Sequence, residues 1–202
     1  MTCPHYFEPG SALNRPLILL HGSGGGEREL VALAREVAPG WALAGLRGSV
    51  EIDGGFAFFH RFPDRSIDEA DIATRAPMLA DDIEAIGIQY GLSKAPIAVG
   101  FSNGAIMAAA LLLTRPALLA GAILFRPLSP FREDPPVRLH NTPVLIIDGA
   151  KDSRRSPGDG ARLAERLKIR EAIVTHRVLP VGHAITAEDR QIAADWLRGI
   201  VS

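Results

Sequence analysis

The sequence predicts an α/β fold in one domain, with a mostly parallel central sheet, helices on both of its faces and no large cap domain. Short apolar runs alternate along the chain with longer segments of helical periodicity, which is the order of strand–helix–strand units. The 202 residues are about the length of one domain, and no repeat, low-complexity tract or linker divides them. We therefore expect residues 1–202 to form a single domain, in which residues 1–14 are a loose N-terminal segment.

The predicted strands are short and mostly apolar, as strands covered on both faces of a parallel sheet are. The first of them, Leu17–Leu20, contains no polar residue at all. In chain order the predicted strands are Leu17–Leu20, Trp41–Leu46, Pro96–Val99, Gly121–Phe125, Val144–Ile147 and Ile173–Leu179.

The segments between these strands have helical periodicity. In the first segment Leu30, Leu33 and Val37 lie on one stripe, which is typical of a helix that packs on a sheet. Pro77 lies inside the second, where its ring and its missing N–H should kink the helix or divide it in two. The predicted helices are Glu27–Ala38, Asp68–Tyr90, Asn103–Leu113, Gly158–Leu167 and Ala187–Ile200.

Two long connections lack a regular pattern. Residues 47–67 contain half of the eight phenylalanines of the chain, namely Phe56, Phe58, Phe59 and Phe62. Long connections in small domains tend to be functional, so these rings either wall a substrate pocket or simply cover the sheet edge. Residues 127–143 are rich in proline and should wrap over the sheet edge. In that segment Leu128 and Phe131 either face a pocket or anchor the connection to the core.

Composition excludes several classes of partner. The net charge of −1 gives no reason to expect a nucleic acid or an anionic membrane surface as a partner. The single cysteine, Cys3, rules out an internal disulfide framework, and the histidines lack the paired spacing of metal ligands, so we expect no metal and no cofactor. The N-terminus does not resemble a signal peptide and no apolar run is long enough to span a membrane, so we expect a cytoplasmic protein without stable membrane association.

The most informative motif is Gly100-Phe101-Ser102-Asn103-Gly104, which joins a predicted strand to a predicted helix. A serine on such a sharp turn takes a strained backbone conformation, and the flanking glycines allow neighbouring chain to approach closely. The turn would lift the hydroxyl of Ser102 clear of the sheet, where a base could reach it. This G-x-S-x-G pattern therefore predicts a nucleophile.

A serine nucleophile needs a base and an anion that orients the base. His183 lies in a glycine-containing loop after the last predicted strand, and Asp152 lies a few residues past the strand before it. Asp148, at the end of that strand, is the alternative acid. The order Ser102, Asp152, His183 differs from the orders of the chymotrypsin and subtilisin triads and is the one expected of α/β-hydrolases. All three residues follow carboxyl ends of predicted strands, the edge at which open α/β sheets place their sites.

The glycine-rich loop after the first strand predicts an oxyanion hole. Acyl transfer places negative charge on the carbonyl oxygen, and backbone N–H groups are well suited to bind that charge. The N–H groups of Ser23 and Asn103 are the two predicted donors. A phosphate-binding loop is the alternative, but the glycines miss the spacing of either phosphate motif. His21, directly before the loop, is expected to be structural.

These motifs together resemble the small phospholipase/carboxylesterase family of α/β-hydrolases. The resemblance rests on Leu19-Leu20-His21-Gly22-Ser23-Gly24-Gly25 with Glu27, on Gly100–Gly104, on Asp152 and on Gly182-His183, and it spans about residues 16–197. It implies a cytosolic serine esterase for short carboxylic or aryl esters that often forms a homodimer. It also implies Ser102, Asp152 and His183 as the triad, with Ser23 and Asn103 as the oxyanion donors.

The acid loop departs from the family pattern. Many relatives have a Val-Pro pair shortly after the acid, whereas this chain has Ser153-Arg154-Arg155-Ser156-Pro157. The departure leaves the shape of this loop open and places Arg154 and Arg155 near the rim of the site. We expect the two arginines to be solvated surface rather than clamps on the substrate.

We predict a serine carboxylesterase that acts on a small-molecule ester through an acyl-enzyme. The alternatives are a thioesterase or lysophospholipase with the same triad, or a ligand-sensing protein that does not turn its ligand over. The predicted substrate-binding residues are Gly22, Phe58, Phe59, Phe62 and Leu128.

Overall fold

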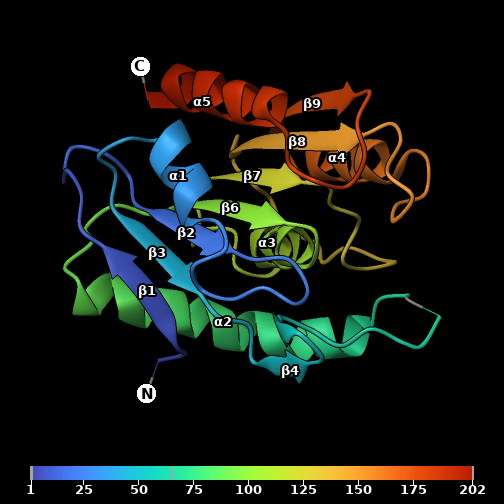
Figure 1. Ribbon diagram of the computed structural model, residues 1–202, viewed down its shortest axis with the longest axis horizontal. Helices are drawn as coiled ribbons and strands as arrows, with labels where there is room; N and C mark the ends of the chain where they lie inside the picture. The colour runs from blue at the N-terminus through green and yellow to red at the C-terminus, as the bar shows by residue number, and fades with distance from the viewer. Residues whose placement is uncertain (1, 65, 202) are drawn as a thin grey trace.

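A seven-stranded sheet forms the centre of the structure, a computed structural model that describes residues 2–64 and 66–201 (Figure 1). Its strand order is β1-β3-β2-β6-β7-β8-β9. The strands are β1 (His5–Glu8), β2 (Leu17–Leu20), β3 (Leu43–Leu46), β6 (Ile97–Phe101), β7 (Gly121–Phe125), β8 (Pro143–Gly149) and β9 (Ile173–Leu179). Only β1 runs antiparallel to its neighbour, and the other pairs in this sheet are parallel. The predicted α/β fold with a mostly parallel sheet is therefore confirmed.

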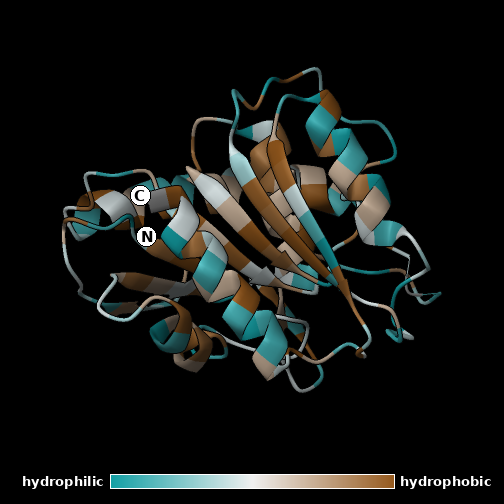
Figure 2. Cartoon of the chain, turned by 90° about the horizontal axis from the view of Figure 1, so that it is seen from above, coloured by the Kyte–Doolittle hydropathy of each residue, from teal (hydrophilic) through white to brown (hydrophobic). Residues whose placement is uncertain are grey.

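Helices cover both faces of the sheet, as predicted. They are α1 (Val31–Val37), α2 (Glu69–Gln89), α3 (Asn103–Thr114), α4 (Asp159–Ile169) and α5 (Ala187–Val201). Alternate strand residues point to opposite faces: Leu17 and Leu19 pack in a core with α1 and α5, whereas Ile18 and Leu20 pack with α2, α3 and α4. In Figure 2 the strands between these layers are accordingly mostly brown, while the helices carry teal outer faces.

The N-terminal segment differs from the prediction. Residues 5–8 form β1 at the edge of the sheet, paired in register with β3, so the prediction of a loose segment over residues 1–14 is wrong there. Tyr6 and Phe7 pack against the cores on opposite faces of the sheet, as neighbouring residues of a strand do. The ring of Phe7 stacks on Tyr90 at a centroid distance of 3.7 Å. Residue 1 lies outside the described part of the chain.

One helix boundary needs correction, and one of the two alternatives at Pro77 is excluded. The first helix begins at Val31 and not at Glu27, because the residues before it form turns in which the Glu29 N–H donates to the carbonyl of Gly26. Pro77 does not divide its helix, and α2 is continuous from Glu69 to Gln89. Pro77 lies on the exposed face of α2, where water can hydrate the carbonyl that lacks an N–H partner.

The connection of residues 47–67 contains a hairpin that the sequence reading missed. Its strands are β4 (Val50–Ile52) and β5 (Gly55–Ala57), which pair antiparallel. The turn signal Asp53-Gly54-Gly55 could have revealed it, since both glycines take positive φ values. The hairpin contacts the glycine-rich loop after β2, because the Phe56 N–H donates to the carbonyl of Gly25 at 3.1 Å. It therefore forms part of the wall around the predicted site.

Candidate active site

Ser102 occupies a strained turn between β6 and α3. Its φ of 52° and ψ of −104° place it outside the conformations that side-chain-bearing residues favour, and its N–H donates to the Phe125 carbonyl at 2.9 Å. A Cβ on Gly104 would lie 2.1 Å from the Leu20 carbonyl oxygen, and one on Gly100 would lie 2.7 Å from the Cα of Ala105. Both glycines are thus required by close backbone approach, as the G-x-S-x-G pattern predicts.

The structure brings Ser102, His183 and Asp152 together at the carboxyl edge of the sheet. His183 Nε2 lies 3.0 Å from Ser102 Oγ, and His183 Nδ1 lies 2.7 Å from Asp152 Oδ2. The other carboxylate oxygen of Asp152 accepts the N–H of Arg154 at 2.8 Å. The Asp152 side chain is fully buried, so its orientation is fixed by these bonds. The arrangement can take a proton from the serine hydroxyl and hold the imidazole in one tautomer.

Asp148, the alternative acid, faces another histidine. Its carboxylate lies 2.7 Å from Nε2 of His176 on β9. It also packs against Gly160, where any Cβ would clash with it. Burial raises the pKa of Asp148 above its ordinary value, against the opposing effect of His176. Asp152, and not Asp148, is therefore the carboxylate placed against His183.

The environment of His183 favours its neutral form. Burial lowers the pKa of the imidazole below its ordinary value, and the charges of Arg155 and Arg154 act in the same direction. The hydrogen bond and the charge of Asp152 oppose this shift without reversing it. The imidazole is thus a free base at neutral pH, which is the form that can accept a proton.

The glycine-rich loop after β2 is held by side chains on both sides. Nε2 of His21 accepts the Gly48 N–H at 2.9 Å, so its Nδ1–H donates to the Gly22 carbonyl at 2.7 Å. The ring is buried and both nitrogens are used, so His21 is structural, as predicted. The N–H of Gly22 donates to Glu29 Oε2 at 2.7 Å, so this predicted substrate-binding residue is tied into the loop.

The two predicted oxyanion donors keep free N–H groups. Within residues 2–64 and 66–201, neither the Ser23 N–H nor the Asn103 N–H donates a hydrogen bond. Ser23 and Ser102 border the same cavity, and Asn103 directly follows Ser102. The Asn103 side chain has a separate task, since its Oδ1 accepts the N–H of Phe58 at 2.7 Å and so ties residues 47–67 to the serine turn.

The cavity beside Ser102 has a volume of about 320 Å³. Phe59, one of the predicted substrate-binding residues, lines it. Phe58 is not among the described residues that line this cavity. Its ring is buried and packs on His21 at a centroid distance of 4.6 Å, so its prediction as a substrate contact is wrong.

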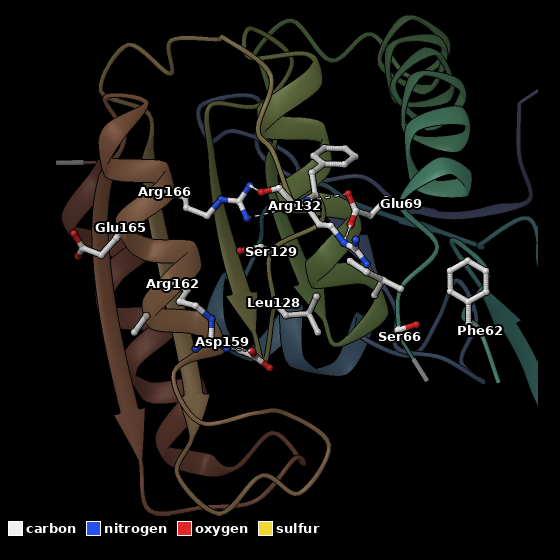
Figure 3. A pocket seen from close by; sticks show the side chains of 13 residues that line it. Phe62, Ser66, Glu69, Leu128, Ser129, Arg132, Asp159, Arg162, Glu165 and Arg166 are labelled. Carbon is white, nitrogen blue, oxygen red and sulfur yellow. Dashed lines mark hydrogen bonds and ion pairs between the residues drawn. The ribbon is translucent and has the colours of Figure 1, made fainter. Parts of the chain in front are cut away.

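Phe62 and Leu128 line a different and larger groove of about 800 Å³. In Figure 3 Leu128 lies between Asp159 and Arg162 of α4 on one side and Ser66 and Phe62 on the other. Neither side chain borders the Ser102 cavity among the described residues, so their prediction as direct contacts of the reacting group is not supported. Leu128 also packs against the core, which agrees with an anchoring role for this connection.

Arg155 was expected to be solvated surface, and that prediction is wrong. It is half-buried, and its Nη2 donates to Ser102 Oγ at 3.1 Å. Arg154, in contrast, is exposed, although it borders the same cavity. The sequence signal for Arg155 is its position in the acid loop, a few residues after Asp152, where this chain has two adjacent arginines.

Arg126 is a second residue that sequence reasoning missed. It directly follows β7, is fully buried and forms a two-pronged ion pair with Asp189 at 2.7 and 2.9 Å. Its Nε and Nη2 also donate to the carbonyls of Gly182 and Ala184, at 3.1 and 2.9 Å. These carbonyls flank His183, so Arg126 fixes both sides of the histidine loop. A charged residue directly after an apolar strand was the signal that could have pointed to it.

Residues 2–64 and 66–201 contain neither a metal-ligand cluster nor a membrane-spanning helix. No three His, Cys, Asp or Glu side chains in these ranges gather closely enough to hold a metal ion. No helix in them has both the length and the apolar character that crossing a bilayer requires.

A mostly parallel sheet with a Ser–His–Asp series at its carboxyl edge defines the class of α/β-hydrolases. The model of the Phospholipase/Carboxylesterase family matches residues 52–200. A protein of Bacillus subtilis (strain 168) named as a hydrolase, MhqD, is 34% identical over 195 residues, which cover 96% of this chain and 97% of that protein. The chain therefore belongs to the Phospholipase/Carboxylesterase family.

Solved structures agree with this family. A carboxylesterase from Bacillus cereus superposes with a TM-score of 0.93 at 31% identity, covering 96% of this chain and 93% of that one. A carboxylesterase from Mesorhizobium loti superposes with a TM-score of 0.89 at 32% identity, covering 95% of this chain and 90% of that one. The protein is thus a hydrolase of the carboxylesterase family.

Proposed function

We propose that this protein is a serine carboxylesterase that hydrolyses short-chain or aryl carboxylic esters through an acyl-enzyme. The observation that carries the proposal is the hydrogen-bonded series from Ser102 through His183 to Asp152. The Ser102 cavity, at about 320 Å³, lies near the small end of the range of ligand pockets, which supports a small acyl group.

In the first half of the reaction, Ser102 Oγ attacks the ester carbonyl while His183 Nε2 takes its proton. Asp152 holds the Nδ1–H of the ring and stabilises the imidazolium that forms. The N–H groups of Ser23 and Asn103 bind the negative oxygen of the tetrahedral intermediate. Each such donor is worth on the order of a hundred- to a thousand-fold in rate.

The imidazolium then returns its proton to the departing alcohol, which leaves the acyl-enzyme and completes the first half. In the second half, a water molecule gives a proton to the same imidazole and attacks the acyl group, and the imidazolium then returns this proton to Ser102 Oγ as the carboxylic acid leaves. Every proton moves through His183 Nε2, so the neutral imidazole is the form from which each half begins.

A fluorophosphonate probe tests the nucleophile. We expect the probe to label the folded protein at Ser102, identified by peptide mass spectrometry, because this hydroxyl is paired with a neutral imidazole at 3.0 Å. Ser102→Ala and the heat-unfolded protein serve as controls and should both remain unlabelled. Labelling at another serine, or none in a protein that hydrolyses no ester, would contradict the proposal and favour a ligand-sensing protein.

The pH dependence follows from His183. Because its pKa is lowered and the neutral form is required, kcat/KM should stay high as pH falls through neutrality. The acid limb is expected to have its midpoint below the ordinary histidine value of about 6.5. The check is kcat/KM for 4-nitrophenyl acetate across the pH range, with the spontaneous rate subtracted. A midpoint clearly above the ordinary value would show that the imidazole is more basic than this environment allows.

The same proposal includes two properties of the whole protein. We propose that it works in the cytoplasm on a small-molecule ester, without a nucleic-acid partner, and that it forms a homodimer. Sedimentation velocity of the purified chain tests the second of these.

A further inference from the structure

The cavity beside Ser102 is lined by cations. Arg61, Arg154 and Arg155 border it together with His60, and none of the described residues that line it is acidic. The chain as a whole has a net charge of −1, so this lining is a local concentration of positive charge. A cleft with one sign of charge raises the local concentration of ligands with the opposite sign.

Arg155 is the cation that contacts the reacting hydroxyl. Its Nε donates to the carbonyl of Arg126 at 2.7 Å, and its Nη1 donates to the carbonyl of Arg154 at 3.0 Å. These two backbone groups orient the guanidinium, and its Nη2 lies 3.1 Å from Ser102 Oγ. Hydrogen bonds to two backbone carbonyls therefore fix the guanidinium, and its Nη2 contacts the Ser102 hydroxyl.

This guanidinium has spare donors and no anionic partner among the described residues. It has five N–H bonds, of which three are used on neutral oxygens. The carboxylates nearby are engaged elsewhere, Asp152 by His183, Asp148 by His176 and Asp159 by Arg162. Burial, followed by the charge of Arg61, lowers the pKa of Arg155 to about 10, so it remains a cation at neutral pH.

A carboxylate is the ligand that such a group binds best. A partly buried charge without a partner is costly, and a guanidinium matches the two oxygens of a carboxylate in geometry as well as in charge. Because Nη2 is so close to Ser102 Oγ, a carboxylate on the spare donors would lie only a few bonds from the carbon that Oγ attacks.

We propose that Arg155 is a specificity residue that binds a carboxylate of the substrate, so that the preferred esters carry a carboxylate within a few bonds of the reacting carbonyl. This inference rests on the proposed esterase function. Half-esters of short dicarboxylic acids carry the group on the acyl side, and acetyl esters of short hydroxy acids carry it on the alcohol side. Both classes of ester carry a carboxylate close to the reacting carbonyl, and the test below distinguishes one class from the other.

The test compares each anionic ester with its neutral amide isostere. Monomethyl succinate is paired with methyl succinamate for the acyl side, and acetoxyacetate with acetoxyacetamide for the alcohol side, each followed by acid release in a pH-stat. We expect kcat/KM to favour the anionic member of at least one pair by about 10- to 100-fold, the range of a charge-assisted hydrogen bond. The pair in which the anionic ester is preferred shows whether Arg155 binds a carboxylate on the acyl side or on the alcohol side of the ester.

Variants assign the preference to Arg155. Arg155→Gln should reduce the anionic-to-neutral ratio to near unity, mainly through KM, and Arg155→Lys should restore part of it by keeping the charge. Arg177→Gln, which removes an exposed arginine on β9, is the matched control and should leave the ratio unchanged. Fluorophosphonate labelling of Ser102 in each variant checks that the site is still assembled.

The possible outcomes separate this inference from the esterase function. Equal rates on both members of both pairs, or a preference that survives in Arg155→Gln, would overturn the role of Arg155 and leave the esterase in place. An equal loss on anionic and neutral esters in Arg155→Gln would also overturn it, because that pattern belongs to stabilisation of the reacting oxygen. No hydrolysis of any ester, together with no labelling of Ser102, would refute the esterase itself.

Discussion

Ser102→Ala is expected to reduce kcat for 4-nitrophenyl acetate by on the order of 10⁵- to 10⁶-fold, the usual cost of removing a triad nucleophile. In the proposed mechanism the hydroxyl is the group that attacks the ester, and its neighbour His183 has no other proton to take in the first step. The protein should still fold, because alanine keeps the Cβ of residue 102 and the N–H that donates to Phe125. The measurement is steady-state kinetics with circular dichroism and urea unfolding of both proteins.

A matched control and a double variant sharpen this prediction. Ser93→Ala removes an exposed hydroxyl just before β6, at the opposite end of that strand, and should have wild-type kinetics. His183→Ala alone should cost about as much as Ser102→Ala, and the double variant should lose little more, because the two groups act as one unit. A Ser102→Ala protein at wild-type rate, or losses that simply add in the double variant, would mean that the reaction uses a different nucleophile.

The sequence could predict the serine, histidine and carboxylate because each follows the carboxyl end of a strand. Parallel strands bring these ends to one edge, so Ser102, Asp152 and His183 converge whatever the details of the loops. Gly100 and Gly104 mark the serine turn because the backbone leaves no room for a side chain there. Short sequence motifs encode backbone geometry of this kind, so this part of the site can be predicted from the sequence alone.

The remaining parts of the site depend on where side chains point across the chain. Arg155 reaches Ser102 over 53 positions and Arg126 reaches Asp189 over 63, and no local pattern encodes either contact. Phe58 and Phe59 are neighbours in a loop of phenylalanines, yet one packs on His21 and the other borders the cavity. Both rings directly follow the hairpin β4–β5, which the prediction for residues 47–67 does not include.

Arg126→Met is expected to lower the free energy of unfolding by about 3–5 kcal/mol, as breaking a buried ion pair does. Arg126 and Asp189 are both fully buried, so the variant leaves an unpaired carboxylate in the interior. Burial alone would raise the pKa of Asp189, but hydrogen bonds from Arg126 and Thr186 hold it below its ordinary value, so the group is charged in the native protein. Urea unfolding measures the loss, with Lys168→Gln as control, because the exposed ion pair of Lys168 with Glu165 should contribute little.

A double variant then separates the fold from the position of His183. Arg126→Met with Asp189→Leu replaces the whole pair by apolar side chains and should recover most of the lost stability, because no buried charge is left without a partner. It should not recover kcat, because the carbonyls of Gly182 and Ala184 still lack the donors that Arg126 supplied. The expected signature is a protein that unfolds near the wild-type urea midpoint and hydrolyses esters slowly. If stability and kcat return together, then Arg126 supports only the fold, and other contacts hold His183 in place.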